Sequence, residues 1–193
     1  LMTESLPRNI ATIWKLGGKT KFPGTLASFL SLIFSFLSYY FLNKTIHGVL
    51  FLIFVALGFW AIRKIHKENE PKDYSWIMID EWIGMWLVSF FLFELSFTLI
   101  QMIGISLGAF VIFRIIDILK FIPPIGIIDK MEKQTVTSVI LDDIIAGCYS
   151  YAILMLAFGF YNLHYIYFSF IFLLPAMISN MTPVLLQGMK KFG

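Results

Sequence analysis

Residues 80–100 read DEWIGMWLVSFFLFELSFTLI, a long apolar run that opens on two adjacent acids, Asp80 and Glu81. A second acidic pair, Asp142-Asp143, opens another apolar run further along the chain. Carboxylates are costly beside a bilayer, so acids doubled at the mouths of hydrophobic helices are typical of a functional site. Because divalent cations prefer hard oxygen ligands, the two pairs predict a cation site at a membrane surface.

The chain as a whole is too apolar for an ordinary soluble domain. Of its 193 residues, 59% are hydrophobic and 14% are charged, and the mean hydropathy is +0.81. A membrane span needs about 20 apolar residues, and six runs approach that length. The runs cover residues 25–42, 47–62, 82–100, 102–119, 144–160 and 163–179. We therefore expect an all-α, polytopic membrane bundle of about six transmembrane or membrane-embedded helices, forming one domain over residues 1–193.

A turn near Gln101 separates the third and fourth runs. Either two full spans or a re-entrant hairpin fits this part of the chain. The positive charges favour an even number of crossings, because 14 of the 15 Lys and Arg residues fall on one side if the N-terminus is cytoplasmic. Only Lys44 falls opposite. The positive-inside rule then predicts that both termini and both acidic pairs face the cytoplasm.

Several other classes of protein are disfavoured. The basic residues lack the arginine stripe of a nucleic-acid surface, so we expect no nucleic-acid partner. The single Cys148 can form neither an internal disulfide nor a redox pair, and its apolar neighbours predict a packed core residue. The three histidines lack the spacing of zinc ligands. The N-terminal segment has no small-residue cleavage pattern, so we expect no removable signal peptide.

A glycine follows each acidic pair within one helical turn, Gly84 after the first and Gly147 after the second. A missing side chain there would let two helices approach closely, so that the carboxylates of both pairs converge on one ion. An all-oxygen ligand set favours Mg²⁺ over zinc or copper. The alternative is that both pairs are ordinary helix N-caps favoured by the helix dipole.

A third charged cluster, Arg114, Asp117 and Lys120, ends the fourth run. Its members recur every three residues and therefore share one helical face. The two cations suit phosphate oxygens, while Asp117 could reach a metal or hold the arginine. The alternative is an ion pair at the membrane edge with snorkelling cations. Asp129, in the next polar turn, is a candidate additional group.

The segment Pro23-Gly24-Thr25 and the nearby Ser28 stand where the first apolar run begins. Backbone N–H groups and the two hydroxyls there could bind an anion, although the same pattern also makes an ordinary helix cap. Glu94 lies 13 residues beyond Glu81, or about 20 Å along a helix, so we leave it out of the site.

Four motifs together resemble the phosphatidylglycerophosphatase A family, in order from about residue 14 to residue 155. They are Pro23-Gly24-Thr25 with Ser28, DEWIG at 80–84, FRIIDILK at 113–120 and LDDIIAG at 141–147. The resemblance implies a magnesium-dependent, multi-pass phosphatase of the bacterial inner membrane, with its active site on the cytoplasmic face. Its reaction would convert phosphatidylglycerophosphate to phosphatidylglycerol and inorganic phosphate. The partners would be this phospholipid and the bilayer, with the oligomeric state left open.

The resulting hypothesis assigns a role to each group. Mg²⁺ would be held by Asp80, Glu81, Asp142 and Asp143, with Asp117 as a further catalytic ligand or an orienting group. The phosphate would be bound by Thr25, Ser28, Arg114 and Lys120. The nucleophile stays open between a water molecule and an aspartate, as do the number of metal ions and the acyl-chain preference.

Two segments depart from the family pattern. The family usually has Lys-Pro-x-Pro-Ile after the arginine helix, where this chain has Lys-Phe-Ile-Pro-Pro-Ile at 120–125. The family also tends to be glycine-rich just before its Asp-Asp, where this chain has Thr-Val-Thr-Ser at 135–138. Both changes affect loop shape, and hence lipid preference or rate, while every charged motif position is kept.

Two other functions fit parts of the pattern. A CDP-alcohol phosphotransferase also uses interfacial aspartates and magnesium, but its Asp-Gly-x-x-Ala-Arg signature is absent from this sequence. A cation transporter or channel would also carry acids near helix ends. Transporters usually bind ions near the midplane between repeated halves, whereas here the acids lie at one edge and no repeat is visible.

Overall fold

The computed structural model describes residues 5–65, 76–93, 98–119 and 136–157, and these segments are helical with short connections. The helices are α1 (Ser5–Ala11), α2 (Pro23–Phe41), α3 (Lys44–Ile65), α4 (Ile79–Phe93), α5 (Leu99–Leu119) and α7 (Val136–Ala157). Four of them are long and apolar enough to cross a membrane, namely α2, α3, α5 and the part of α7 from Val139. The expected all-α architecture is confirmed for these residues. The sixth predicted run, 163–179, lies outside them.

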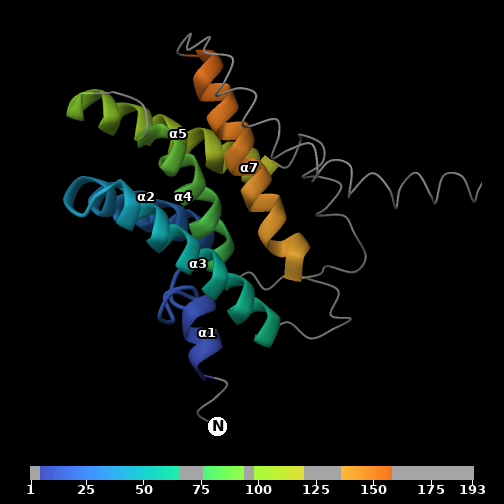
Figure 1. Ribbon diagram of the computed structural model, residues 1–193. Helices are drawn as coiled ribbons and strands as arrows, with labels where there is room; N and C mark the ends of the chain where they lie inside the picture. The colour runs from blue at the N-terminus through green and yellow to red at the C-terminus, as the bar shows by residue number, and fades with distance from the viewer. Residues whose placement is uncertain (1–4, 66–75, 94–97, 120–135, 158–193) are drawn as a thin grey trace, which may run out of the picture.

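Helix α4 is the short, central element of the bundle (Figure 1). Its described part has 15 residues and is about 22 Å long, less than the roughly 30 Å of a bilayer's hydrocarbon core. Nevertheless it contacts each of the other five described helices. Its sides join two apolar clusters, one around Met85 and Val88 and the other around Ile83 and Trp86. The acidic pair at its start is therefore set in the middle of the bundle.

Aromatic rings hold α2 and α3 against α4. The ring centroids of Phe34 in α2 and Trp86 lie 5.3 Å apart, and Phe54 of α3 stacks on Trp82 with centroids 5.7 Å apart. The Ser31 hydroxyl donates a hydrogen bond of 2.7 Å to the Trp82 carbonyl oxygen. These contacts fix the first turns of α4, which carry Asp80 and Glu81, against the N-terminal half of α2.

A buried polar network joins the same three helices near the opposite end of α2. The Trp86 indole lies 3.3 Å from Nε2 of His47, and Nδ1 of His47 lies 2.7 Å from the Ser38 hydroxyl. An indole N–H can only donate, so Nε2 accepts and Nδ1 carries the proton that it donates to Ser38. The Ser38 hydroxyl in turn donates to the Ser35 carbonyl oxygen. Both ring nitrogens of this fully buried histidine are thus engaged by protein groups.

Helices α4 and α7 meet backbone to backbone at Gly84 and Gly147, as the sequence predicts. A Cβ atom at Gly84 would lie 2.7 Å from the Asp143 carbonyl oxygen, and one at Gly147 would lie 2.7 Å from the Gly84 carbonyl oxygen. Real Cβ atoms essentially never come so close to backbone atoms. Cys148 lies beside this contact in the buried core, as expected. Only glycine at both positions allows this helix spacing.

The boundary between the third and fourth runs differs from the prediction. Helix α5 already begins at Leu99, so Gln101 lies inside its first turn and does not form the turn between the two helices. The Gln101 side chain accepts hydrogen bonds of 3.0 Å from the backbone N–H and the hydroxyl of Thr98. Gln101 N–H reaches back to the Thr98 hydroxyl at 3.4 Å. This reciprocal pair is a capping box, so Gln101, which was predicted to lie in a turn between two helices, lies in the first turn of α5.

The second acidic pair also lies elsewhere than expected. Helix α7 begins at Val136, so Asp142 and Asp143 stand nearly two turns inside it and are not at a helix end. Polar residues such as Thr137 and Ser138 extend the helix ahead of the apolar run. The pair therefore cannot serve as N-caps, which removes the capping alternative for α7. By contrast, Asp80 and Glu81 do lie in the first turn of α4.

We expect Gly84→Ala to destabilise the protein, because the added methyl group meets backbone atoms of α7 that cannot rotate away. Overpacking of this kind costs about 1–3 kcal/mol. Gly104→Ala is the matched control, since a Cβ atom there meets nothing within 4 Å and alanine favours the helix. Thermal unfolding in detergent should show a lower midpoint for Gly84→Ala only. Equal midpoints for the two variants would contradict the close contact.

Candidate active site

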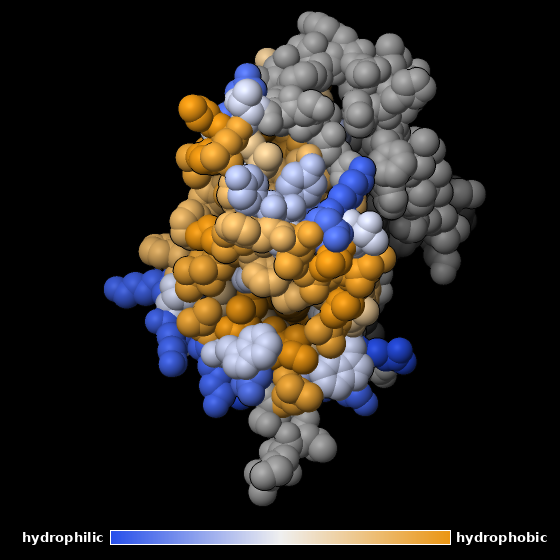
Figure 2. Space-filling model, turned by 60° about the vertical axis from the view of Figure 1, so that its left-hand side comes forward, coloured by the Kyte–Doolittle hydropathy of each residue, from blue (hydrophilic) through white to orange (hydrophobic). Residues whose placement is uncertain are grey.

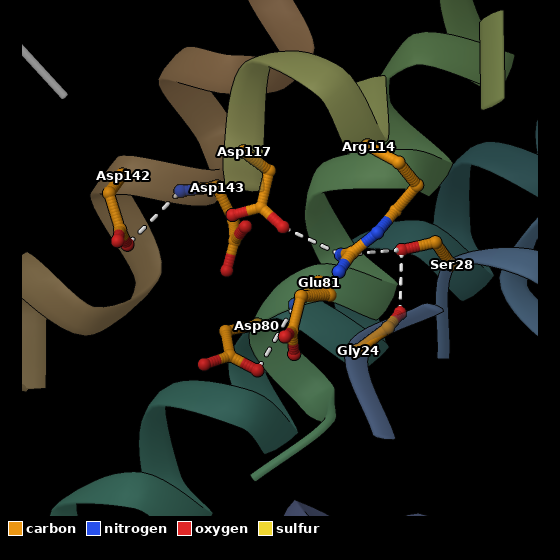
Figure 3. Close-up of polar contacts among 8 residues, drawn as sticks. All are labelled: Gly24, Ser28, Asp80, Glu81, Arg114, Asp117, Asp142 and Asp143. Carbon is orange, nitrogen blue, oxygen red and sulfur yellow. Dashed lines mark hydrogen bonds and ion pairs between the residues drawn. The ribbon is translucent and has the colours of Figure 1, made fainter. Parts of the chain in front are cut away.

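Three carboxylates from two helices converge at the start of α4 (Figure 3). Asp80 and Glu81 come from the first turn of α4, and Asp143 comes from α7. One oxygen from each lies within 4.8 Å of the others. Asp80 is 3% exposed and Asp143 is 4% exposed. The contact between Gly84 and Gly147 produces this convergence, since it brings the backbone of Asp143 directly onto α4.

The two acidic pairs share the same local geometry. The backbone N–H of Glu81 donates to Oδ1 of Asp80 over 3.1 Å, and that of Asp143 donates to Oδ1 of Asp142 over 3.1 Å. In each pair the first side chain is therefore oriented by the backbone of the second. Asp142 nevertheless stands apart from the other carboxylates and is not part of the group of three (Figure 3).

Arg114 is held on the other side of the acids by two helices. Its Nη1 atom forms an ion pair of 2.6 Å with Asp117 on the same α5 face and lies 3.4 Å from the Ser28 hydroxyl of α2. Ser28 donates its own proton to the Gly24 carbonyl oxygen over 2.8 Å. The Arg114 and Asp117 side chains are 13% and 12% exposed. The predicted shared face of these two residues is confirmed.

Gly24 makes this arrangement sterically feasible. A side chain at this position would overlap the Glu81 carboxylate, and its Cβ would lie 3.1 Å from Nη1 of Arg114. The start of α2, the acid of α4 and the guanidinium of α5 therefore meet over one glycine. The sequence pattern predicted an anion-binding segment or a helix cap around Gly24 and did not predict this steric role. The position of Gly24 beside a proline at a helix start does not indicate which residues it would contact.

The electrostatics of the cluster favour a bound cation. Four carboxylates, those of Asp80, Glu81, Asp117 and Asp143, lie around the Arg114 guanidinium, so the formal charge of this cluster is −3. Asp143 is repelled by Asp117, Asp142, Glu81 and Asp80. Its Oδ1 atom is buried and accepts no hydrogen bond from the part of the chain that the structure describes. Buried charge requires compensation, and an all-oxygen set suits a hard divalent cation.

The predicted site residues thus divide into three groups. One group is brought together around the acids and the guanidinium: Ser28, Asp80, Glu81, Arg114, Asp117 and Asp143. A second group lies on the same helices nearby, with Thr25 half-buried in the first turn of α2 and Asp142 on α7. Lys120 and Asp129 lie outside the described residues, as does Glu94.

Comparison with known proteins identifies relatives that cover most of the chain. Over 157 residues, the chain is 29% identical to a protein of Bacteroides thetaiotaomicron named "Putative phosphatidylinositol-3-phosphatase", covering 79% of this chain and 93% of that protein. Over 133 residues, it is 31% identical to phosphatidylglycerophosphatase A of Escherichia coli K12, covering 68% of this chain and 72% of the relative. No solved structure matches significantly.

A sequence model of one family, described as phosphatidylglycerophosphatase A, matches residues 9–158. This range begins in α1, ends just past α7 and includes every acidic residue of the cluster. The match agrees with the resemblance carried by the four motifs. The chain therefore belongs to the phosphatidylglycerophosphatase A family of membrane lipid phosphatases.

Proposed function

We propose that this protein is a Mg²⁺-dependent phosphatase that hydrolyses phosphatidylglycerophosphate to phosphatidylglycerol and inorganic phosphate. We place the reaction at the cytoplasmic face of a bacterial inner membrane. The observation that carries the proposal is the convergence of Asp80, Glu81 and Asp143 within 4.8 Å, beside Arg114, in a member of this family. A bound cation and the guanidinium would together offset the negative charge of a phosphate monoester.

The three converging carboxylates are the proposed metal ligands, and Asp142 stays a predicted fourth. The Glu81 backbone N–H orients the Asp80 carboxylate, and the Asp143 backbone N–H orients that of Asp142. The Oδ1 atom of Asp143 accepts no hydrogen bond within the described residues, which leaves it open to a cation. Bound Mg²⁺ would offset the negative charge of the phosphate and lower the pKa of a water molecule. The protein residues around the site would exclude bulk water and hold the lipid phosphate next to the carboxylates.

Arg114 is the proposed phosphate-binding group. An arginine has five N–H donors, and only Nη1 is used by Asp117 and Ser28 in the contacts above. Its Nε atom is buried and donates to no acceptor among the described residues. The guanidinium therefore keeps donors for phosphate oxygens while Asp117 orients it. Lys120, three residues after Asp117 in the sequence, and Thr25 would add to the same binding.

The two named relatives differ in the lipid substrate that their names describe. One carries the name of a phosphatidylglycerophosphatase and the other that of a phosphatidylinositol-3-phosphatase. Both names describe phosphate monoesters on lipid headgroups, which would present the same group to the acids and Arg114. We propose phosphatidylglycerophosphate because the family match covers all four motifs.

Purified protein in detergent with Mg²⁺ should release phosphate from phosphatidylglycerophosphate faster than from phosphatidylinositol 3-phosphate. Asp143→Asn keeps the side-chain shape but removes the buried charge, so we expect a loss of about a hundredfold or more in kcat/KM. Ser150→Ala is the control on the same helix, because its hydroxyl donates only to the Ala146 carbonyl oxygen. Wild-type activity in Asp143→Asn would refute the site, and a reversed preference would refute the substrate.

Removal of the metal should abolish phosphate release, and Mg²⁺ should restore it after the chelator is washed out. Binding can be measured apart from catalysis with Mn²⁺ as a paramagnetic probe. We expect Asp80→Asn and Glu81→Gln to weaken Mn²⁺ binding at least tenfold, because each removes one of the converging charges. Ser150→Ala should bind Mn²⁺ like the wild type. Activity that survives chelation would contradict the magnesium requirement.

Replacement of Arg114 by lysine keeps its charge but loses the planar fork, so kcat/KM should fall about tenfold or more.

Asp117→Asn separates the two roles considered for that carboxylate. If Asp117 orients Arg114, the variant should lower kcat/KM and leave Mn²⁺ affinity unchanged. A matching loss of Mn²⁺ affinity would instead make Asp117 a metal ligand.

A further inference from the structure

The connection between α1 and α2 contains a strained turn that the site does not use. Ile13, Trp14 and Lys15 have φ angles of 47°, 54° and 68°, so three successive residues with side chains adopt the left-handed conformation. This conformation costs roughly 1–2 kcal/mol per residue. Strain of this size persists only where the surroundings hold it in place. We name residues 12–22 the N-terminal hook.

Specific contacts hold the hook in this shape. The Thr12 hydroxyl donates to the Arg8 carbonyl oxygen over 2.7 Å and accepts from the Lys15 backbone N–H over 2.9 Å. The Gly17 N–H donates to the Thr12 carbonyl oxygen over 3.1 Å. A side chain on Gly17 would overlap the Trp76 carbonyl oxygen, so the hook packs directly on the segment that leads into α4. The turn is therefore built into the fold.

The hook presents aromatic and basic side chains to the outside. Trp14 is 73% exposed and Phe22 is 71% exposed. Lys15, Lys19 and Lys21 are exposed between them, and none forms an ion pair within the described residues. No Asp or Glu occurs from residue 5 to residue 65, so nothing in this stretch neutralises the lysines. The surface is thus both basic and aromatic.

This surface lies next to the candidate active site. Phe22 directly precedes Pro23 and Gly24, and Gly24 contacts both the Glu81 carboxylate and Arg114. Figure 2 shows hydrophilic and intermediate side chains at the lower end of the molecule, where α1 lies in Figure 1, below a broad belt of apolar side chains. A basic and aromatic surface bordering an apolar belt lies at the depth of lipid headgroups.

We propose that the N-terminal hook is a binding surface for anionic phospholipid headgroups, separate from the acids that hold the metal. The aromatic rings would lie in the interface and the three lysines would pair with headgroup phosphates and carboxylates. The charge of the surface selects anionic over zwitterionic lipid. The inference goes beyond the proposed reaction, because headgroup binding there requires neither a metal ion nor hydrolysis. It would enrich anionic lipid at the entrance to the site.

The test places the full chain in nanodiscs that contain phosphatidylcholine and phosphatidylserine. Phosphatidylserine is neither the proposed substrate nor its product. Two samples are compared, one with brominated phosphatidylserine and one with brominated phosphatidylcholine, and both contain the same amount of brominated lipid. Bromine quenches tryptophan fluorescence. The chain has five tryptophans, so the signal of Trp14 is the difference between the wild type and Trp14→Phe. We expect brominated phosphatidylserine to quench Trp14 about twofold more than brominated phosphatidylcholine, and high salt to reduce this excess.

The excess should disappear in Lys15→Gln/Lys19→Gln/Lys21→Gln. The control is Arg63→Gln/Lys64→Gln, which removes two exposed cations from the last turn of α3 and should keep the excess. Equal quenching by the two lipids in the wild type would overturn the proposal. The proposal would also be overturned if Arg63→Gln/Lys64→Gln lost the excess quenching to the same extent. The net charge of the protein, and not the hook, would then attract the lipid. Neither readout depends on phosphate release, so this proposal and the proposed reaction can fail separately.

Discussion

The close backbone contact between Gly84 and Gly147 is the constraint on which the candidate site depends. It brings the backbone of Asp143 against α4, and so brings its carboxylate to Asp80 and Glu81. Like charges at this spacing repel each other, and burial strengthens the repulsion. Apolar packing of α4 against all its neighbours opposes that repulsion. A rigid core thus holds acids in an arrangement that becomes favourable once a cation binds.

A second glycine contact completes the arrangement from the other side. Gly24 lets the start of α2 lie against both Glu81 and Arg114. Asp117 and Ser28 then fix the guanidinium from α5 and α2. The proposed metal half and the proposed phosphate half therefore share Gly24 as their common neighbour. Small residues at helix contacts are typical of membrane bundles, and here two such contacts position charge.

The acidic start of α4 connects the site to the membrane. The 15 described residues of α4 extend about 22 Å, less than the roughly 30 Å of a hydrocarbon core. Its acidic first turn is nevertheless buried by α2, α5 and α7, which are of spanning length by composition. The hook, which packs on the segment before α4, lies beside this buried turn. Together these features fit an enzyme whose substrate stays in the bilayer while its headgroup enters the protein.

Much of the local structure could be predicted, because its causes are local. Hydropathy located α2, α3 and α5 within a few residues at both ends, and a three-residue spacing placed Arg114 and Asp117 on one face. The start of α5 was misplaced, although the Thr98 and Gln101 capping box that decides it was readable in the sequence. The start of α7 was misplaced because polar residues extended the helix ahead of its apolar run.

The sequence by itself determined an apolar helical chain, two acidic pairs each followed by a glycine, and the family that those motifs resemble. Only the tertiary structure decided that Asp143 joins Asp80 and Glu81 while Asp142 stands apart, and that Gly24 faces Glu81. The physical reason is that periodicity assigns residues to a helix face, whereas convergence depends on where helices cross and in which register. Crossing and register come from contacts between residues as distant in sequence as Gly84 and Gly147.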